Sequence, residues 1–394
     1  MINIKDNIYW LGIRDWETRT FHGTEYSTHR GTSFNSYLIK DEKVVLVDTV
    51  FTPFHKQFID LLEEKVGLDK IDLLVVNHTE PDHSGAMPYL LDKRPDLPIY
   101  CSKNGAMIIK KHYHKDWNFQ VVKTGDTVDL GKNKLIFVEM PMLHWPDSMA
   151  TYVSGANVLL SNDAFGQHYA APQLYNDLVD QCELSQESLK YYANILAPFN
   201  KLVKAKIKEI VNLNLPIEMI APSHGVIWRD NPMQIVEKYN EWADNYHEGI
   251  VTILYDTMYG ATKKMALAIA DGLESNGVTT KVFNVGKWDK NDVIAEVYKS
   301  KGIIVGSSTI NRGILSAVAA ILEIIEGLKL QGKIGASFGA SGWSAESPKI
   351  IEERLRSAGI EIVSESIGVQ YNPAPEDLQK CVAYGAAFAE RVKN

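Results

Sequence analysis

Residues 250–394 alternate strictly between short apolar runs and longer amphipathic runs, and this alternation limits the fold more than any other feature. Short apolar runs are typical of buried strands, and the intervals between them have helical periodicity. Such alternation predicts a parallel sheet with helices on both faces. The predicted strands are Ile250–Tyr255, Val278–Val285, Gly302–Val305, Ile334–Phe338 and Ile360–Val369. The predicted helices are Lys263–Asn276, Asn291–Lys299, Ser316–Leu328, Pro348–Ser357 and Pro375–Val392.

The part of the chain before this alternation has a different order, with strand-like runs at its start and middle and helical runs between them. The helical runs are Pro53–Val66 and a longer one from about Gln186 to Val211. The strand-like runs are Ile8–Gly12, Ser36–Ile39, Val44–Asp48, Leu73–Val76, Ile99–Cys101, Leu135–Val138, Val158–Leu160 and Ile217–Ile220. Because 394 residues exceed one ordinary core, we expect two domains. We place them at residues 1–248 and 249–394.

Composition excludes several classes of function. The formal charge is −8 and the two signs are interspersed, so no basic face for nucleic acid is expected. Met1–Asp6 lacks the basic and apolar regions of a signal peptide, and no apolar stretch reaches the length of a membrane span. Cys101, Cys182 and Cys381 form no Cys-x-x-Cys pair, which argues against disulfides, iron–sulfur clusters and thiolate zinc sites. We expect a cytoplasmic protein with no nucleic acid or membrane partner.

Residues 78–83 place four side chains that can bind metal within six positions. His78, Glu80, Asp82 and His83 directly follow the apolar run Ile71–Asn77, which is typical of a buried strand. Imidazole and carboxylate ligands suit zinc, iron and manganese, whereas a thiolate site would need a nearby cysteine. The alternative interpretation is a solvated polar loop, because short motifs also occur by chance.

Three further candidate ligands also follow strand-like runs. They are His144, Asp163 and His224. Strand ends meet at one edge of a sheet, where α/β folds build their sites, so we expect all seven side chains to converge. A single such residue could be a surface histidine or a helix cap. Four imidazoles and three carboxylates are too many for one tetrahedral metal and about right for two metals that share a carboxylate.

The first strand of the alternating region runs into a segment that is typical of a phosphate-binding loop. Hydroxyls and backbone amides at a helix N-terminus can hold a phosphate, and a glycine allows close approach. The Gly-x-Gly-x-x-Gly motif of a dinucleotide site is absent. Trp343 is the candidate for stacking on a flat ring, although it could instead lie in the core. The candidate cofactor contacts are Thr257, Met258, Tyr259, Gly260, Ala261, Thr262, Ser307, Ser308, Thr309, Ile310, Asn311, Gly313, Ser341, Gly342 and Trp343.

These motifs resemble a known family. The loop at residues 78–83 is similar to the His-x-His-x-Asp-His motif of the metallo-β-lactamase superfamily, but Glu80 replaces the second histidine. That form resembles the flavodiiron proteins, also called A-type flavoproteins, and all seven expected ligand positions match. The segment Thr257–Thr262 resembles the phosphate loop of flavodoxins, with Tyr259 in place of one hydroxyl residue. Further similar segments are Asp15-Trp16, Phe21–Gly23, Pro141–Ser148, Asn162–His168 and Ser223–Gly225.

The resemblance implies an α/β protein with a metallo-β-lactamase-like αββα sandwich, followed by a flavodoxin-like, doubly wound, parallel five-stranded sheet that binds FMN. It implies that His78, Glu80 and His144 bind one iron, that Asp82, His83 and His224 bind the other, and that Asp163 bridges them. These seven residues would be catalytic as well as metal-binding, reducing nitric oxide to N2O or O2 to water. The extra carboxylate of Glu80 favours iron, because its charge stabilises the ferric state.

The resemblance also implies partners. Some family members carry a rubredoxin module with two Cys-x-x-Cys pairs, which this chain lacks, so a separate rubredoxin-like protein or a deazaflavin would supply electrons. A head-to-tail homodimer, or a dimer of dimers, is expected. Three alternatives remain: a dinuclear zinc hydrolase with an attached flavodoxin domain, an electron carrier with a relic metal domain, and a flavin-binding scaffold without catalysis. Glu80 argues against the first and the complete ligand set against the second. Rapid flavin reoxidation that is lost when His83 is replaced would exclude the third.

Overall fold

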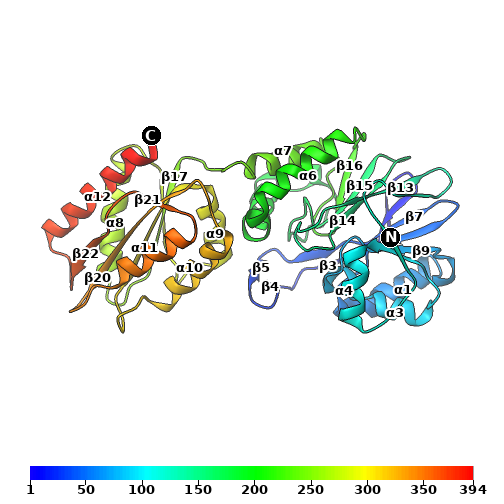
Figure 1. The fold of residues 1–394 in the computed structure, drawn as a ribbon, viewed down its shortest axis with the longest axis horizontal. Coiled ribbons are helices and arrows are strands. Elements are labelled where there is room, and N and C mark those ends of the chain that lie inside the picture. The colour runs from blue at the N-terminus through cyan, green and yellow to red at the C-terminus, as the bar shows by residue number, and fades with distance from the viewer. Residues whose placement is uncertain (394) are drawn as a thin grey trace. The chain divides into compact units, whose positions relative to one another are not determined.

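The computed structural model describes residues 1–393, which form two compact units (Figure 1). The first unit contains Met1–Tyr191 and Phe199–Glu241. The second contains Tyr192–Pro198 and the chain from Trp242 onward. The domain boundary at residue 248 stays a prediction, because the units change over at Glu241–Trp242 and a short earlier segment belongs with the second unit. Within residues 1–393, no helix is both long enough and apolar enough to cross a membrane.

The first unit contains two large sheets. The larger has the strand order β1-β2-β7-β8-β9-β10-β11 and the smaller has the order β12-β13-β14-β15-β16. The larger sheet consists of β1 (Ile2–Lys5), β2 (Ile8–Trp10), β7 (Tyr37–Lys40), β8 (Val44–Val47), β9 (Leu73–Val75), β10 (Ile99–Ser102) and β11 (Phe119–Val122). The smaller consists of β12 (Thr127–Asp129), β13 (Lys134–Glu139), β14 (Met149–Val153), β15 (Val158–Asn162) and β16 (Met219–Pro222). Two short antiparallel pairs, β3 (Ile13–Asp15) with β6 (Thr32–Phe34) and β4 (Thr20–Phe21) with β5 (Tyr26–Ser27), complete the strands.

The core of this unit lies between the two sheets. Alternate side chains of β8, Val45 and Val47, belong to the same buried cluster as Leu135 and Phe137 of β13. Each such residue stabilises the fold by about 1.5–3 kcal/mol on full burial. Helices cover the outer faces, with α1, α3 and α4 on one side of the strands and α6 and α7 on the other (Figure 1). The helices are α1 (His55–Lys65), α2 (Pro81–Ser84), α3 (Met87–Lys93), α4 (Lys103–Tyr113), α5 (Gln181–Tyr191), α6 (Asn200–Asn212) and α7 (Met233–Trp242).

The single long helix predicted from Gln186 to Val211 is wrong. Helix α5 ends at Tyr191, a wide π turn spans Tyr192–Leu196, a 3-10 turn spans Ala197–Phe199, and α6 follows. Pro198 explains the break, because proline has no N–H to donate and its ring clashes with the preceding turn. Asn194 lies in the interrupted segment, which belongs to the second unit, and it exchanges hydrogen bonds with Asn291 of the same unit (3.1 and 2.9 Å).

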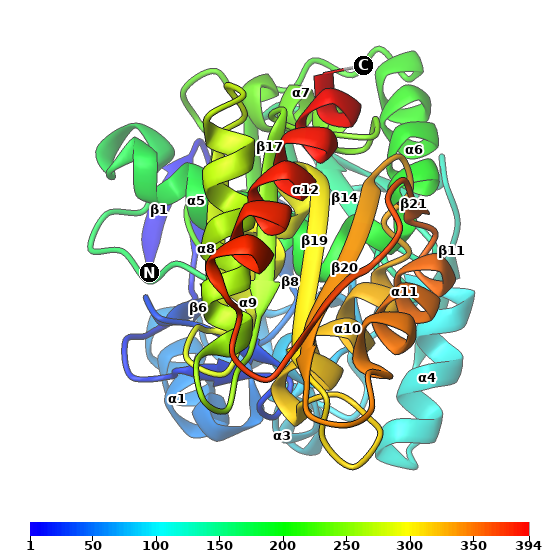
Figure 2. The same cartoon turned by 90° about the vertical axis from the view of Figure 1, so that its left-hand side faces the viewer.

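The second unit is a parallel sheet with helices on both faces, as predicted. Its order is β18-β17-β19-β20, with β21 and β22 both paired to β20. Figure 2 looks onto the face covered by α8 and α12, and the other face carries α9, α10 and α11 (Figure 1). The strands are β17 (Ile250–Tyr255), β18 (Thr280–Asn284), β19 (Ser300–Ser308), β20 (Ile334–Ser341), β21 (Glu361–Ile362) and β22 (Ile367–Gln370). The helices are α8 (Ala261–Glu274), α9 (Lys290–Lys299), α10 (Ser316–Leu328), α11 (Ser347–Ser357) and α12 (Pro375–Lys393).

One predicted strand of this sheet differs from the structure. The fifth run, Ile360–Val369, is two strands separated by a break between Ile362 and Ile367, so five strand positions contain six strands. Because all strands are parallel, their carboxyl ends lie at one edge, and the loops that follow β17, β19, β20 and β22 gather there.

Candidate metal centre and cofactor cavity

The seven predicted metal ligands come together in the first unit, and each lies near the end of a strand. Six are buried, and the side chain of His144 is only slightly exposed. The chain turns into the short helix α2 at Pro81, whose fixed φ suits a first helical position. His78 and Glu80 follow β9, Asp82 and His83 lie in α2, His144 lies between β13 and β14, Asp163 follows β15, and His224 follows β16.

Two groups of ligand atoms form, one on each side of the cluster. In the first, the Nε2 atoms of His78 and His144 both lie 3.3 Å from Glu80 Oε2. An ion with ligands at 2.0–2.2 Å separates neighbouring donors by about 3.0–3.5 Å, so this spacing suits one ion.

The second group has the same spacing. The Nε2 atoms of His83 and His224 lie 3.1 and 3.0 Å from Asp82 Oδ2. The structure therefore brings together two triads, each of two imidazoles and one carboxylate.

Asp163 faces both triads with a different oxygen for each. Its Oδ2 lies 3.2 Å from His144 Nε2 and 3.6 Å from His78 Nε2. Its Oδ1 lies 2.9 Å from His83 Nε2 and 3.6 Å from His224 Nε2. Ser223 Oγ donates a hydrogen bond to Oδ1 (2.8 Å), which fixes the orientation of the carboxylate. This is the geometry of a carboxylate that bridges two metals.

The polar atoms of this centre fit bound cations. Asp82 Oδ1 is buried and has no hydrogen-bond partner among residues 1–393, which is rare for a carboxylate in a protein interior. Three carboxylates and four imidazoles supply oxygen and nitrogen donors that suit iron, zinc and manganese. The donor set therefore fits two transition-metal ions, as the sequence predicts.

The electrostatic field of the centre favours positive charge. Burial lowers the pKa of His83, but Asp82 and Asp163 outweigh it and raise the pKa to about 9. Burial likewise opposes the charged form of His144, yet Asp163 and Glu80 raise its pKa to about 9. Burial raises the pKa of Asp163, but His83 and His144 hold it well below its usual value. A site that stabilises imidazolium by this means also stabilises a metal cation.

Hydrogen bonds from outside the triads orient several ligands. The Nδ1 atom of His78 lies 3.0 Å from Asp147 Oδ2, and His224 Nδ1 lies 2.6 Å from the carbonyl oxygen of Ser33. With the proton on Nδ1 in each case, Nε2 is free to bind metal. Glu80 Oε1 lies 3.1 Å from His22 Nε2, so only its second oxygen faces the triad.

A cavity of about 410 Å³ reaches the centre within the first unit. Glu80 and Asp82 of the centre line it, and three phenylalanines give it an apolar wall. A small, weakly polar molecule could enter by this route. The lining residues are Asp15, Thr18, Thr20, Phe21, His22, Gly23, Phe34, Phe51, Glu80, Pro81 and Asp82.

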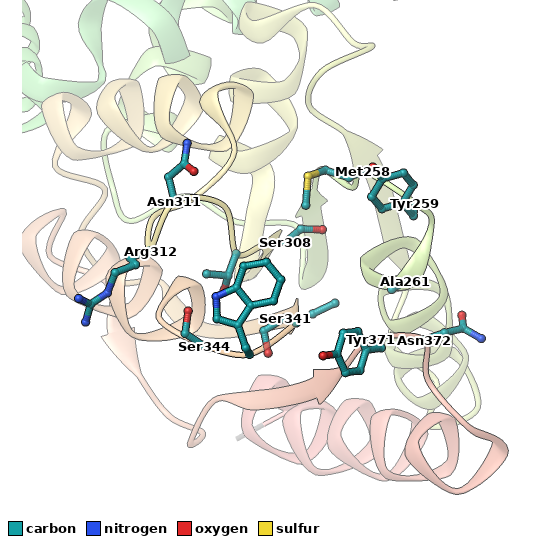
Figure 3. Close-up of a pocket in the computed structure, with 14 residues that line it drawn as sticks. Met258, Tyr259, Ala261, Ser308, Asn311, Arg312, Ser341, Ser344, Tyr371 and Asn372 are labelled. Atoms are coloured by element: carbon teal, nitrogen blue, oxygen red, sulfur yellow. The ribbon is translucent and has the colours of Figure 1, made fainter.

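The second unit contains a larger cavity, of about 750 Å³, at the carboxyl edge of its sheet. Side chains reach it from four loops, which follow β17, β19, β20 and β22 (Figure 3). Its volume falls in the range of ordinary cofactor sites. The lining residues are Met258, Tyr259, Ala261, Ser308, Thr309, Asn311, Arg312, Ala340, Ser341, Gly342, Trp343, Ser344, Tyr371 and Asn372.

The structure brings most of the predicted cofactor contacts to this cavity, but not all. Those that line it are Met258, Tyr259, Ala261, Ser308, Thr309, Asn311, Ser341, Gly342 and Trp343. Those that do not line it are Thr257, Gly260, Thr262, Ser307, Ile310 and Gly313, whose assignment as contacts stays a prediction. The Ser307 hydroxyl accepts a hydrogen bond from the backbone N–H of Leu315 (3.0 Å), and this bond holds the second loop in shape.

The loop between β17 and α8 has the form of a phosphate cradle. Gly260 has φ +88° and precedes the first helical residue, Ala261. A side chain at Gly260 would meet no atom within 4 Å, so the space beside the helix N-terminus is open. Thr257 Oγ1 accepts a hydrogen bond from Gly260 N (3.0 Å), and Thr262 Oγ1 lies 2.9 Å from Ser308 Oγ. Helix N–H groups aimed into open space suit an anion.

Two aromatic side chains at the cavity are largely exposed. Trp343 is 90% exposed, which excludes the alternative that it lies in the core, and Tyr371 is 64% exposed. Sequence reasoning did not identify Tyr371 and Asn372, which reach the cavity from the loop after β22 (Figure 3). The rule that sites form at strand ends could have found them, because both directly follow the fifth predicted strand. The predicted contacts also omit Arg312 and Ser344, which line the cavity from loops that the sequence does predict.

Comparison with known proteins covers both units. The family described as ODP family beta lactamase matches residues 32–225, and the family described as flavodoxin matches residues 253–385. The chain is 50% identical to a protein of Vibrio vulnificus named anaerobic nitric oxide reductase flavorubredoxin, over 99% of this chain and 79% of that protein. It is 51% identical to a protein of the same name from Klebsiella pneumoniae, over 99% of this chain and 82% of that protein.

Solved structures show the same similarity. Rubredoxin oxygen:oxidoreductase from Desulfovibrio gigas has a TM-score of 0.96 at 37% identity, covering 99% of this chain and 98% of that one. The flavodiiron protein from Giardia intestinalis has a TM-score of 0.92 at 33% identity, covering 98% of this chain and 95% of that one. The expected fold, a metallo-β-lactamase-like unit followed by a flavodoxin-like unit, is therefore confirmed.

Proposed function

The chain belongs to the flavodiiron protein family, and we propose that it is an oxidoreductase that reduces nitric oxide to N2O, O2 to water, or both. Electrons come from a separate donor and pass through FMN to two non-haem irons. The observation that carries this proposal is the position of Asp163, whose two oxygens face two different triads. One carboxylate placed in this way is suited to a pair of metals.

The names of the relatives support both substrates. The Vibrio vulnificus and Klebsiella pneumoniae proteins are named nitric oxide reductases, and the Desulfovibrio gigas protein is named for rubredoxin and oxygen. The two reactions balance as 2 NO + 2 e⁻ + 2 H⁺ → N2O + H2O and O2 + 4 e⁻ + 4 H⁺ → 2 H2O. The partly apolar cavity beside Glu80 and Asp82 suits either diatomic molecule.

We assign the ligands as the sequence predicts. His78, Glu80 and His144 would hold one iron, Asp82, His83 and His224 would hold the other, and Asp163 would offer one oxygen to each. When bound, the irons polarise the diatomic molecule and change oxidation state, while the flavin supplies electrons. The protein contributes fixed ligand orientation through its outer hydrogen bonds and a buried, low-dielectric setting that strengthens every charge interaction.

The FMN site is proposed to be the cavity of the second unit. The open helix N-terminus at Gly260 would receive the phosphate, with Thr257 and Thr262 shaping the loop. Trp343 would stack on the flavin ring, and Ser308, Asn311 and Ser341 present polar atoms to the cavity. Backbone amides contribute most of the binding of a phosphate at such a loop, so the tyrosine at position 259 is compatible with phosphate binding.

The electron donor is proposed to be a rubredoxin-like protein. The Vibrio vulnificus relative is named a flavorubredoxin and the Desulfovibrio gigas structure a rubredoxin oxygen:oxidoreductase, and these names support a donor of this kind. We further propose a head-to-tail homodimer in the cytoplasm. The dimer is an expectation carried over from the family, and the cytoplasm is inferred from the cysteine pattern.

A zinc hydrolase with an attached flavodoxin domain is the weaker candidate. It would account for the fold of the first unit. It would not account for the extra negative charge of Glu80, since zinc has no higher oxidation state for that charge to stabilise.

The deciding experiment is anaerobic. Iron, zinc and FMN are quantified per chain, and the reduced protein is mixed with NO or with O2. We expect about two irons and one FMN per chain, with rapid flavin reoxidation by at least one gas. Zinc at the same stoichiometry with an inert flavin would overturn the proposal.

A further inference from the structure

We propose that Asp147 makes the two metal sites unequal, so that the site of His78, Glu80 and His144 binds iron more tightly and stabilises its ferric state more than the site of Asp82, His83 and His224. The first is called the His78 site and the second the His224 site. Asp147 is a positioning residue, because it acts through His78. This inference rests on the proposed function, since it assumes that the metals are iron.

Asp147 faces His78 from inside the protein. Its side chain and that of His78 are both fully buried. The Asp147 Oδ2 atom lies 3.0 Å from His78 Nδ1 and accepts a second hydrogen bond from the backbone N–H of Thr79 (2.7 Å). The nitrogen on the other side of the imidazole, Nε2, is the atom that faces Glu80 and Asp163.

The surroundings hold this pair in one geometry. Ser102 Oγ donates a hydrogen bond to the backbone carbonyl of Asp147 (2.8 Å), and the indole of Trp145 meets the His78 ring edge-on at 5.3 Å. Neither ring nor carboxylate can exchange its partner for water, because neither is exposed. The contact is therefore shielded from solvent.

The histidines of the His224 site lack this support. His224 Nδ1 faces the neutral carbonyl oxygen of Ser33 at 2.6 Å. His83 Nδ1 is buried and has no hydrogen-bond partner in the described chain, residues 1–393. The outer hydrogen-bond partner is thus a full negative charge for His78 and a neutral dipole for His224, while His83 has no such partner among residues 1–393.

This difference has a chemical consequence. A carboxylate that accepts the Nδ1–H of a metal-bound imidazole raises the basicity of Nε2 and fixes its direction, and losing such a partner typically lowers metal affinity or activity by about 10–100-fold. A more basic nitrogen and a nearby negative charge both stabilise Fe³⁺ more than Fe²⁺. The His78 site should therefore fill first and be oxidised first.

A structural role for Asp147 can be separated from this one. Both hydrogen bonds that it accepts end on Oδ2. In Asp147→Asn, an amide oxygen at that place keeps both bonds and removes only the charge. The NH2 group would take the place of Oδ1, which makes no hydrogen bond within residues 1–393, so it would displace no existing partner.

A matched control uses the same substitution at another buried aspartate. Asp48 accepts hydrogen bonds from the backbone N–H of Asn77 (2.7 Å) and from Asn162 Nδ2 (3.1 Å), not from an imidazole. Asp48→Asn removes a buried charge that interacts most strongly with His83 of the His224 site and less strongly with His78. It should lower stability and, unlike Asp147→Asn, should not weaken iron binding at the His78 site relative to the His224 site.

The test begins with the full-length wild type. With FMN bound and its metals removed by chelation, the protein receives one equivalent of ⁵⁷Fe²⁺ without oxygen. Anomalous diffraction shows which site is filled, and Mössbauer spectra of the half-oxidised, fully loaded protein show whether the two irons differ. We expect iron in the His78 site and distinct ferric and ferrous signals. In Asp147→Asn, affinity at the His78 site should fall about 10–100-fold and the signals should become more alike, with the FMN potential unchanged.

The outcomes are distinguishable. Wild type that takes up no iron at either site would refute the proposed function. Wild type that fills the His224 site first would overturn the present inference without reference to any variant. The inference would also fail if both irons bind but Asp147→Asn keeps the wild-type loading order and spectra, or if Asp48→Asn changes them equally.

Discussion

Replacing Trp343 with alanine should weaken FMN binding by a predictable amount. Trp343 lines the cavity of the second unit and is 90% exposed when no ring covers it. A flavin ring that lies against one face of the indole would remove that face from water. The substitution deletes this contact and leaves the phosphate loop at Gly260 untouched.

The size of the effect follows from the exposed area. A tryptophan side chain presents about 200 Å², and a flat ring on one face covers about half of the exposed part, or about 90 Å². At about 25 cal/mol per Å², covering this area contributes about 2.2 kcal/mol, which is about 40-fold in Kd. Trp343→Phe should recover most of the loss, because a benzene ring restores most of the stacking surface.

Equilibrium titration measures this directly. FMN is removed from the full-length protein and added back while the quenching of flavin fluorescence is followed. Trp288→Ala is the matched control, since Trp288 is 57% exposed in the same unit but packs on Phe283 (5.2 Å) and does not line the cavity. The reasoning would be refuted if Trp343→Ala changed Kd by less than about 3-fold, or if Trp288→Ala weakened binding as much.

Two further predictions follow from the structure. Asp163→Ala removes the oxygens that face both triads. Turnover should fall by more than about 100-fold, because losing only an outer hydrogen-bond partner of a metal ligand already costs up to about that much. The flavin absorbance should persist, and loss of both turnover and flavin absorbance would mean that the two sites are not independent. Lys333 is buried, which lowers its pKa to about 7, and its Nζ donates to the carbonyls of Tyr298 and Ser300 (2.6 Å each). Between pH 7 and its ordinary pKa of 10.5 the unfolded chain binds more protons, so the free energy of unfolding of the second unit should rise with pH, by at most about 5 kcal/mol. In Lys333→Met this rise should disappear. Thermal unfolding of both proteins across this pH range measures the difference, and an equal rise in the two would contradict the lowered pKa of Lys333.

The second unit was predictable because its central strands, β17, β19 and β20, are buried on both faces. An apolar run such as Ile250–Tyr255 stands out from the amphipathic helices on either side, and the predicted and observed bounds agree there. The errors occur where tertiary structure decides. Pro198 lies in the 3-10 turn Ala197–Phe199 that interrupts an otherwise helical pattern, and the fifth predicted strand breaks between Ile362 of β21 and Ile367 of β22.

The convergence of the seven candidate metal ligands was predictable for a related reason. Strand ends are visible in the sequence, and histidine or carboxylate side chains follow four of them. The hydrogen-bond partners of these side chains were not predictable. No local pattern connects Asp147 to His78, 69 residues away, or His22 to Glu80. Both contacts exist only after the sheets pack and the short β4–β5 hairpin folds back. Tyr371 is different, since the rule that found the other cavity loops also applies to it.

The pairing of Glu80 with His22 explains how a carboxylate can stand where related hydrolases place a histidine. An imidazole offers one nitrogen to the metal, whereas a carboxylate has a second oxygen that needs a partner when it is buried. Glu80 directs Oε2 toward the first triad, and His22 contacts Oε1 at 3.1 Å. The exchange therefore adds one negative charge without leaving an unsatisfied oxygen. With Asp82 and Asp163, it would give two bound metals three carboxylates, a charge that favours iron, which can reach the ferric state, over zinc, which has no higher state to stabilise.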